Sequence, residues 1–326
     1  MDLRENSRAP ILAGLNTEGE SIIVDYSENL INLVLFFDPV SKASLDAVEF
    51  TRLLSRRYNG LSVGFWYVMV PRLSCMYKAA AAHRALDRLG LFGGVLFDVN
   101  NMISLRAGRQ TLPALLVVES NGNLKALYEG EISFREAERS LQARLSLSGY
   151  RDELPQMMAI DSDYAVLRSN SVVRQLGYAT DDYTLGSLLV PESAQQFALP
   201  DFCLLDTIYP YGSWYVSRDF IEGKEGGTFY ASCGREESLH IFAGADREAT
   251  LRIHTSIESP RNLVLGKDVR EENGLLSLCV DECRPYEVLA ASGDSDVLIS
   301  LQIASGSVRL FAVEFCQRSP VVPATR

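Results

Sequence analysis

The spacing of apolar residues changes along this chain, and the change predicts two domains of different classes. In the first half, apolar runs of strand length alternate with stretches that have the apolar spacing of an amphipathic helix. In the last third, short apolar runs follow one another with Gly, Asp, Asn and Pro between them, which is typical of an antiparallel β-sandwich. We therefore expect an α/β domain over residues 1–148, a connecting segment over 149–200 and an all-β, jelly-roll-like sandwich over 201–326.

The length and composition fit a folded protein of two domains. The 326 residues are 47% hydrophobic and 22% charged, which are ordinary values for globular proteins. The net charge of −11 opposes binding to nucleic acid. No apolar run reaches the roughly 18 residues of a membrane span, and the N-terminus lacks the basic start and apolar core of a signal peptide. These features predict a cytoplasmic protein with no nucleic-acid partner and no membrane span.

The first half reads as three strands with two helices between them, followed by a hairpin and a helix. The strands are expected over 31–37, 61–70 and 94–99, and the helices over 45–58 and 76–90. Asn121-Gly122 is a strong hairpin-turn signal. Ser133 and Glu136 then have the spacing of a capping box at the start of the last helix. In the last third, about eight short strands are expected between residues 213 and 316.

The first strand runs into the first helix through "FFDPVSKAS", residues 36–44. Ser41 has the position of a helix N-cap, where a hydroxyl accepts a hydrogen bond from a backbone N–H of the first turn. Ser44 falls in that first turn, close to Asp46, whose charge suits the positive end of the helix dipole. A nucleophilic serine needs a base within hydrogen-bond reach, and none of the three histidines lies in a recognisable triad context. We therefore expect both serines to be structural.

The order of these elements resembles the thioredoxin-like redoxins of the TlpA and DipZ type. In that family, a strand ending in two aromatic residues leads into Trp-Cys-x-x-Cys at the start of a long helix. Phe36 and Phe37 match the aromatic pair, and Val40 stands at the position of the Trp. Ser41 and Ser44 stand at the positions of the two cysteines. The resemblance implies a thioredoxin-like fold for the first domain.

The resemblance extends over nearly the whole chain. Leu112-Pro113 matches the family's cis-proline, which faces the dithiol, and the following hairpin and helix resemble the end of the family's thioredoxin domain. Residues 182–188, "DYTLGSL", resemble a Tyr-Leu-Gly element of DipZ-like proteins. Trp214 and Tyr215 begin a region that resembles the C-terminal sandwich of those proteins, a domain similar to carbohydrate-binding modules.

The departure from the family is chemical. In such sites one cysteine thiolate attacks a disulfide and the second resolves the mixed disulfide, and serine hydroxyls do neither. We therefore expect a redox-inactive binding or scaffold protein that recognises a peptide, protein or small ligand. By the resemblance, Val40, Leu112 and Pro113 would line its groove, beside the vacated dithiol positions Ser41 and Ser44. No cofactor and no metal are expected.

Two alternatives remain open. The first is a thiol-disulfide oxidoreductase or peroxidase that uses another cysteine, with Cys75 as the candidate, or one whose two motif cysteines were engineered to serine. The second is carbohydrate binding by the sandwich, with Trp214 or Tyr215 exposed to stack on a sugar ring. Because neighbouring strand residues point to opposite faces, at least one of these two aromatics belongs in the core. The remaining cysteines, including Cys279 and Cys283 in "CVDEC", are expected to be reduced and incidental.

Overall fold

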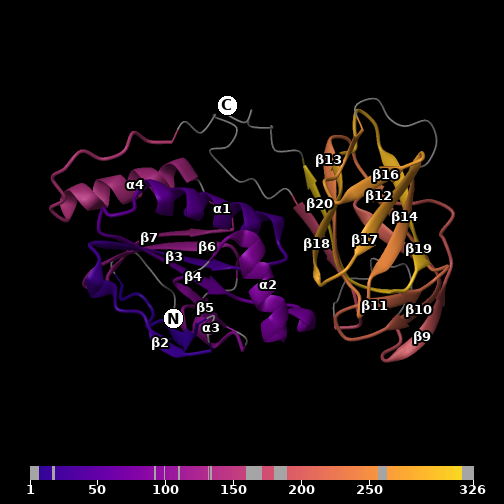
Figure 1. Cartoon of the computed structure of the whole chain (residues 1–326), viewed down its shortest axis with the longest axis horizontal. Helices are drawn as coiled ribbons and strands as arrows, with labels where there is room; N and C mark the ends of the chain where they lie inside the picture. The colour runs from indigo at the N-terminus through magenta and orange to yellow at the C-terminus, as the bar shows by residue number, and fades with distance from the viewer. Residues whose placement is uncertain are drawn as a thin grey trace. The chain divides into compact units, whose positions relative to one another are not determined.

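The chain forms two compact units in a computed structural model (Figure 1). Unit 1 comprises the described residues up to position 158, apart from Leu73–Cys75. Unit 2 comprises Leu73–Cys75 and the described residues from position 171 onward. The structure describes residues 7–16, 19–91, 93–98, 100–108, 111–130, 132, 134–158, 171–179, 189–255 and 263–317. Among these residues, no helix is long and apolar enough to cross a lipid bilayer.

Unit 1 is built on a sheet of seven strands in the order β2-β1-β5-β4-β3-β6-β7. The central strand β3 is parallel to β4 and antiparallel to β6. The strands are β1 (Ala13–Leu15), β2 (Ser21–Ile23), β3 (Ile31–Phe37), β4 (Val63–Met69), β5 (Val95–Phe97), β6 (Ala114–Glu119) and β7 (Leu124–Glu129). The helices are α1 (Lys42–Arg57), α2 (Ala79–Leu89), α3 (Met102–Arg106) and α4 (Phe134–Leu147), with short 3-10 turns η1 (Tyr26–Glu28) and η2 (Ser74–Tyr77).

Local sequence signals explain most of these elements. All seven residues of β3 are buried, as expected of a central strand in a sheet covered by helices. Phe50 of α1 stacks on Phe134 of α4 at a ring-centroid distance of 4.0 Å, which holds these two helices together. Gly90 ends α2 with φ of +64°, and Gly122 takes φ of +79° in the β6–β7 turn, conformations that favour glycine. The predicted thioredoxin-like fold is confirmed.

Unit 2 is an all-β sandwich of thirteen described strands, as predicted in class. Each of the eight expected apolar runs contains a strand, and the run over 213–221 contains parts of two, β10 and β11, on either side of a turn. The strands are β8 (Ser171–Gln175), β9 (Ser193–Phe197), β10 (Thr207–Val216), β11 (Ile221–Lys224), β12 (Thr228–Cys233), β13 (Glu237–Gly244), β14 (Ala249–Thr255), β15 (Val264–Leu265), β16 (Val269–Glu272), β17 (Leu275–Val280), β18 (Arg284–Ala291), β19 (Val297–Ser305) and β20 (Ser307–Gln317).

The segment expected to be a connector contributes two strands to the sandwich. β8 pairs with β20 and β9 pairs with β10, so residues 171–175 and 193–197 are not linker. Both strands are short and rich in polar residues, which is why their apolar pattern is weak. Residues 182–188, which carry the Tyr-Leu-Gly resemblance, and Ser133 of the expected capping box lie outside the described residues.

A disulfide joins Cys75 to Cys283, 208 positions later in the chain. This bond corrects two expectations, since Cys75 was the candidate for a reactive thiol and Cys283 was expected to be an incidental reduced cysteine. The free cysteines in the described part of the chain are Cys203, Cys233, Cys279 and Cys316.

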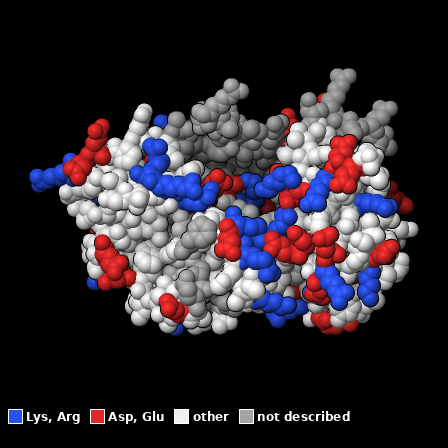
Figure 2. All heavy atoms as spheres, viewed as in Figure 1, with Lys and Arg blue, Asp and Glu red and all other residues white. Residues whose placement is uncertain are grey.

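The surface charge is mixed on the face of the molecule shown in Figure 2. Acidic and basic side chains are interspersed over both units in that view. Although the net charge of the chain is −11, the described acidic residues in this view do not form one extended negative area.

Candidate functional site

The carboxyl ends of β3 and β4 and the beginning of β6 lie at one edge of the unit 1 sheet. Phe36 pairs with Ala114, so the register places Pro113 beside Phe37, where β3 ends. The backbone N–H of Val70, just after β4, donates to the Phe37 carbonyl at 2.8 Å. The Leu112–Pro113 peptide bond is cis, as the family resemblance implied. The topology therefore gathers Pro113 and the β3–α1 junction at the same edge.

Ser41 is the N-cap of α1, as predicted. Its backbone is extended (φ −87°, ψ 128°), and its Oγ accepts a hydrogen bond from the backbone N–H of Ser44 at 3.4 Å. Its carbonyl accepts from the N–H of Leu45 at 2.9 Å, which begins the helical hydrogen-bond ladder. The hydroxyl of Ser41 thus satisfies one of the N–H groups that a helix leaves without a partner.

Ser44 is fully buried, and its Oγ accepts a hydrogen bond from the backbone N–H of Asp38 at 3.1 Å. Asp38 is also buried, and its Oδ1 accepts from the N–H of Val40 at 3.1 Å. The Nε of Arg72 lies 4.0 Å from the other Asp38 oxygen. Ser44 and Asp38 therefore hold the turn between β3 and α1 in place, which is a structural role for both.

Neither Asp38 nor Arg72 was predicted from the sequence as a site residue. Asp38 follows directly after a seven-residue buried strand. A carboxylate next to a buried strand needs hydrogen-bond partners, and this position could have marked Asp38 as a site residue. The histidines lie elsewhere: His83 is in α2, where its ring stacks on Phe97, and the other two are in strands of unit 2. The buried Ser44 hydroxyl thus accepts the backbone N–H of Asp38, which is a structural role.

Ser44→Ala is expected to lower the free energy of unfolding by about 1–3 kcal/mol, because the buried N–H of Asp38 loses its acceptor. Ser41→Ala is expected to cost about 1 kcal/mol through loss of the cap. Urea denaturation of the full chain measures both. Ser146→Ala, at an exposed position of α4, is the control, with a change within about 0.5 kcal/mol. A Ser44→Ala variant as stable as this control would contradict the assignment.

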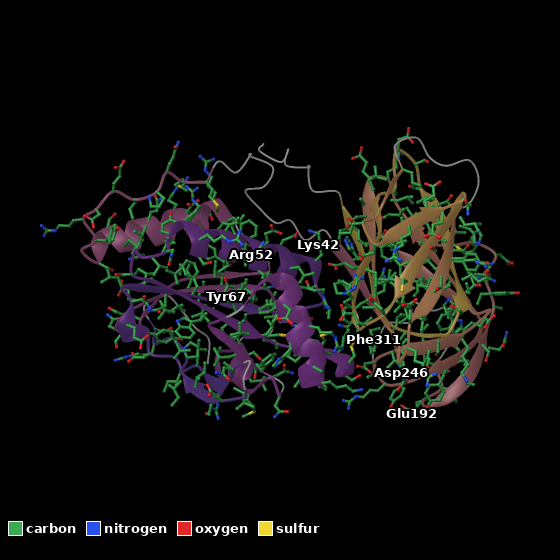
Figure 3. All side chains as sticks on the ribbon, in the orientation of Figure 1. Lys42, Arg52, Tyr67, Glu192, Asp246 and Phe311 are labelled. Atoms are coloured by element: carbon green, nitrogen blue, oxygen red, sulfur yellow. A yellow bond between two sulfur atoms is a disulfide. The ribbon has the colours of Figure 1, made fainter. Side chains whose placement is uncertain are left out.

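The edge beside the serines presents partly exposed apolar groups. Val40 and Leu112 are half-buried, whereas Pro113 is buried. Lys42 lies at the N-terminal end of α1, as Figure 3 shows, and forms an ion pair with Asp46 one turn later. The charge of Lys42 is thereby balanced locally.

The free cysteines of the described residues do not belong to unit 1. Cys75 is disulfide-bonded, and the four free cysteines all belong to unit 2. Burial raises the pKa of Cys203, Cys233 and Cys279 above the ordinary thiol value. Reactive cysteines need the opposite shift, so these three thiols are protonated near neutral pH.

Trp214 is a core residue, which corrects its candidacy for sugar stacking. Its side chain is 0% exposed, packs edge-to-face on Phe229 at 6.1 Å, and donates a hydrogen bond from Nε1 to the Tyr211 carbonyl at 3.1 Å. Gly223 lies against the indole so closely that a Cβ there would be 2.6 Å from a ring carbon. The ring is therefore enclosed and cannot meet a ligand.

Tyr215 points to the opposite face of β10 and is 38% exposed. Its hydroxyl donates to Oε2 of Glu192 at 2.7 Å, and this bond holds the pKa of Glu192 below its ordinary value. Figure 3 labels Glu192 beside β9. Tyr215 also lines a groove of about 610 Å³ together with Glu222 and Lys224. Of the two aromatics proposed from the sequence, Tyr215 is the one available to a ligand.

Unit 2 also holds a buried carboxyl group that the sequence pattern gave no reason to select. Glu237 is 8% exposed, and its Oε2 accepts a hydrogen bond from the N–H of Gly234 at 2.7 Å. Burial, and then a hydrogen bond with Asp206, raise the pKa of Glu237 to about 7. At a pH between 4.5, the ordinary pKa that applies in the unfolded chain, and about 7, Glu237 is protonated in the folded state and ionised in the unfolded state.

Stability is therefore expected to fall as the pH rises from about 5 to about 8, since the contribution of Glu237 is lost above its folded pKa. Glu237→Gln keeps a neutral side chain at every pH and is expected to remove this part of the dependence. Urea unfolding at both pH values measures the effect, with the exposed neighbour Glu236→Gln as the control. An unchanged pH dependence in Glu237→Gln would show that another group is responsible.

Comparison with known proteins bears on the fold of unit 1. Neither protein-family models nor curated sequences give a match. Unit 1 is similar to a thioredoxin-family thiol:disulfide interchange protein from Chlorobium tepidum TLS, with 16% identity over 44% of this chain and 99% of that one (TM-score 0.36). It is also similar to the thioredoxin domain of a thiol-disulfide oxidoreductase from Bacteroides vulgatus, with 14% identity over 40% and 91% of the two chains (TM-score 0.35).

A secreted disulfide oxidoreductase from Mycobacterium tuberculosis has 14% identity over 42% of this chain and 95% of its own, with a TM-score of 0.34. Each of these likenesses covers less than half of this chain. At this identity the likeness concerns fold alone, and function must be argued from the site.

Proposed function

We propose that the chain is a redox-inactive, thioredoxin-like binding protein that recognises extended polypeptide at the sheet edge beside Pro113. The observation that carries the proposal is the structural engagement of both serines. Ser41 caps α1, and the buried Ser44 accepts the Asp38 N–H. Disulfide exchange requires a thiolate at such a position, and hydroxyls in its place stabilise the turn without turnover.

The surface beside the serines supports binding without chemistry. In the family that the chain resembles, extended polypeptide lies beside the cis-proline. Here Val40 and Leu112 offer partly exposed apolar side chains at that edge, next to the beginning of β6. Backbone groups at a strand end can pair with an extended peptide, and neighbouring apolar side chains add contact area. The ligand class that fits is therefore an extended, largely apolar polypeptide segment.

A permanently unfolded polypeptide tests this proposal. Fluorescently labelled α-lactalbumin, reduced and carboxymethylated so that it carries no thiol, is titrated with the full chain and followed by anisotropy. Saturable binding is expected. Leu112→Asp is expected to raise the dissociation constant about tenfold or more, because one central apolar contact is lost. Leu147→Asp is the matched control, because Leu147 is a 75% exposed leucine of α4 in the same unit. Equal affinities of the two variants would end the proposal.

The oxidoreductase alternative can no longer use Cys75 as a free thiol, but the Cys75–Cys283 disulfide is a candidate redox pair. Cys75 is bonded to Cys283, so catalysis would have to pass through reduction of that disulfide. Disulfides persist mainly in oxidising compartments, and this bond favours such a compartment over the cytoplasm expected from the sequence. Alkylation of free thiols in the protein purified from its own cells, followed by mass spectrometry, tests the oxidised state directly.

The groove at Tyr215 supports carbohydrate binding as a second candidate function. An exposed tyrosine ring over a groove that also holds Glu222 and Lys224 combines a stacking face with hydrogen-bonding groups. A glycan array probed with the wild-type chain and with Tyr215→Ala tests this candidate. Tyr211→Ala is the control, because Tyr211 is 48% exposed on the same strand and does not line the groove. Sugar signals retained by Tyr215→Ala would argue against the groove.

A further inference from the structure

Four strands of unit 2, β19, β14, β17 and β16, are hydrogen-bonded in that order and are labelled in Figure 1. Their register aligns a row of polar residues across the sheet. Arg252 of β14 is opposite Ser277 of β17, and Ser277 is opposite Arg270 of β16. On its other side, Arg252 is opposite Gln302 of β19. Residues directly opposite one another share a face of the sheet, so this row lies on one face.

The row lies on the outer face of the sandwich. Leu251 and Ile253, the neighbours of Arg252 along β14, belong to the buried core, and successive strand residues alternate between faces. Arg252 and Arg270 are both exposed. Two strand spacings of about 4.8 Å place their Cα atoms roughly 10 Å apart, so both guanidinium groups can reach the space above Ser277.

These two arginines differ from other arginines of the same unit. Arg284 is ion-paired with Asp268 and Arg309 with Asp246. Within the described ranges, neither Arg252 nor Arg270 forms an ion pair with a carboxylate. His254, two residues beyond Arg252 on the same strand, faces the same side by the strand alternation. Arg252 and Arg270 therefore present two cationic side chains on the outer face of β14 and β16.

A cavity with both polar and apolar walls adjoins Arg252 and His254. Its volume is about 550 Å³, and Arg252 and His254 line it together with Leu263, Leu265, Leu275 and Leu276. Leu275 is 57% exposed at this position, and water is an unfavourable environment for such a side chain. Glu271 also lines the cavity and is opposite Leu276, so these two residues share the face of the sheet that is opposite to the face of Arg252 and Arg270. The volume falls in the usual range of small-molecule sites.

We propose that this face of unit 2 binds an organic anion, a single carboxylate or similar acidic head carried on an apolar body. Arg252 and Arg270 hold the acidic head above Ser277, since guanidinium groups bind carboxylates through paired, charge-assisted hydrogen bonds. The apolar body lies in the cavity against the exposed Leu275, which is on the same face of β17 as Ser277. The site is separate from the groove at Tyr215 and from the edge beside Pro113, and it does not depend on either proposed function.

Anilinonaphthalene sulfonate, a fluorescent organic anion, tests the site with the full chain, and decanoate serves as the unlabelled competitor. Saturable binding is expected, with displacement by decanoate and little displacement by sodium sulfate at the same concentration. Arg252→Gln is expected to raise the dissociation constant about tenfold or more through loss of a charged hydrogen-bond donor. Arg235→Gln, at an exposed turn of the same unit, is expected to bind as the wild type does.

Leu275→Ser separates the two parts of the site. It is expected to weaken decanoate, which has a long apolar body, more than acetate, which has almost none. Thermal melting of each variant confirms that the exposed substitutions leave the fold intact. Absence of saturable binding, displacement by sulfate as effective as by decanoate, or equal affinities of Arg252→Gln and Arg235→Gln would each overturn the proposal.

Discussion

Replacing Trp214 with alanine is expected to lower the free energy of unfolding by about 3–5 kcal/mol, the range for large buried aromatic residues. The indole is fully buried among core residues of the sandwich and packs edge-to-face on Phe229. Gly223 has no side chain to fill the space that the indole leaves. The bond from Nε1 to the Tyr211 carbonyl is lost as well. The variant therefore combines a cavity with a broken hydrogen bond.

Tyr215→Ala is the matched control for this prediction, because it removes the aromatic ring next in sequence from the other face of β10. Its expected effect on stability is smaller, about 1 kcal/mol, because the ring is 38% exposed and the main loss is the hydrogen bond to Glu192. Urea denaturation followed by circular dichroism compares the two variants. Similar losses of stability for both would mean that the Trp214 ring does not occupy the core.

Restoring cysteines at positions 41 and 44 is expected to give the chain a dithiol that it lacks. Ser41 Oγ lies 3.4 Å from the backbone nitrogen of Ser44 at the beginning of α1, so the two side chains start from the same turn. A thiol at a helix N-terminus is stabilised as the thiolate. In Ser41→Cys we therefore expect the pKa of the new thiol to fall about one unit or more below the ordinary 8.5.

The double variant Ser41→Cys/Ser44→Cys is expected to form an intramolecular disulfide in air. Mass spectrometry after alkylation counts the protected thiols, and the single variants provide the controls, each with one additional reactive thiol. If both new cysteines stay reduced under oxidising conditions and are alkylated by the reagent, these positions do not have the geometry of a dithiol site.

Local patterns predicted the elements of unit 1 because their causes are local. The buried run of β3, the cap at Ser41 and the turn at Gly122 each depend on residues within a few positions. The cis bond before Pro113 came from the family resemblance and not from the local pattern. Those features placed the candidate edge correctly in the sheet. They did not reveal that Asp38 and Ser44 are joined by a hydrogen bond.

Features that depend on distant residues could not be predicted in this way. Nothing near Cys75 or Cys283 in the sequence indicates that they meet across 208 positions. Strand alternation required that Trp214 and Tyr215 face opposite sides, but it did not say which side holds the core. The row of Arg252, Ser277 and Arg270 exists only through the pairing of three strands, and single-strand patterns carry no information about that register.

Insulin reduction with the full unmodified chain tests whether the thioredoxin-like unit binds without redox turnover. We expect dithiothreitol to reduce insulin at the same rate with and without the chain. The Ser41→Cys/Ser44→Cys variant, tested in parallel, is expected to accelerate the reaction and so shows that the assay detects this fold. Acceleration by the unmodified chain, abolished by Cys75→Ser, would show that the protein is an oxidoreductase and not a redox-inactive binding protein.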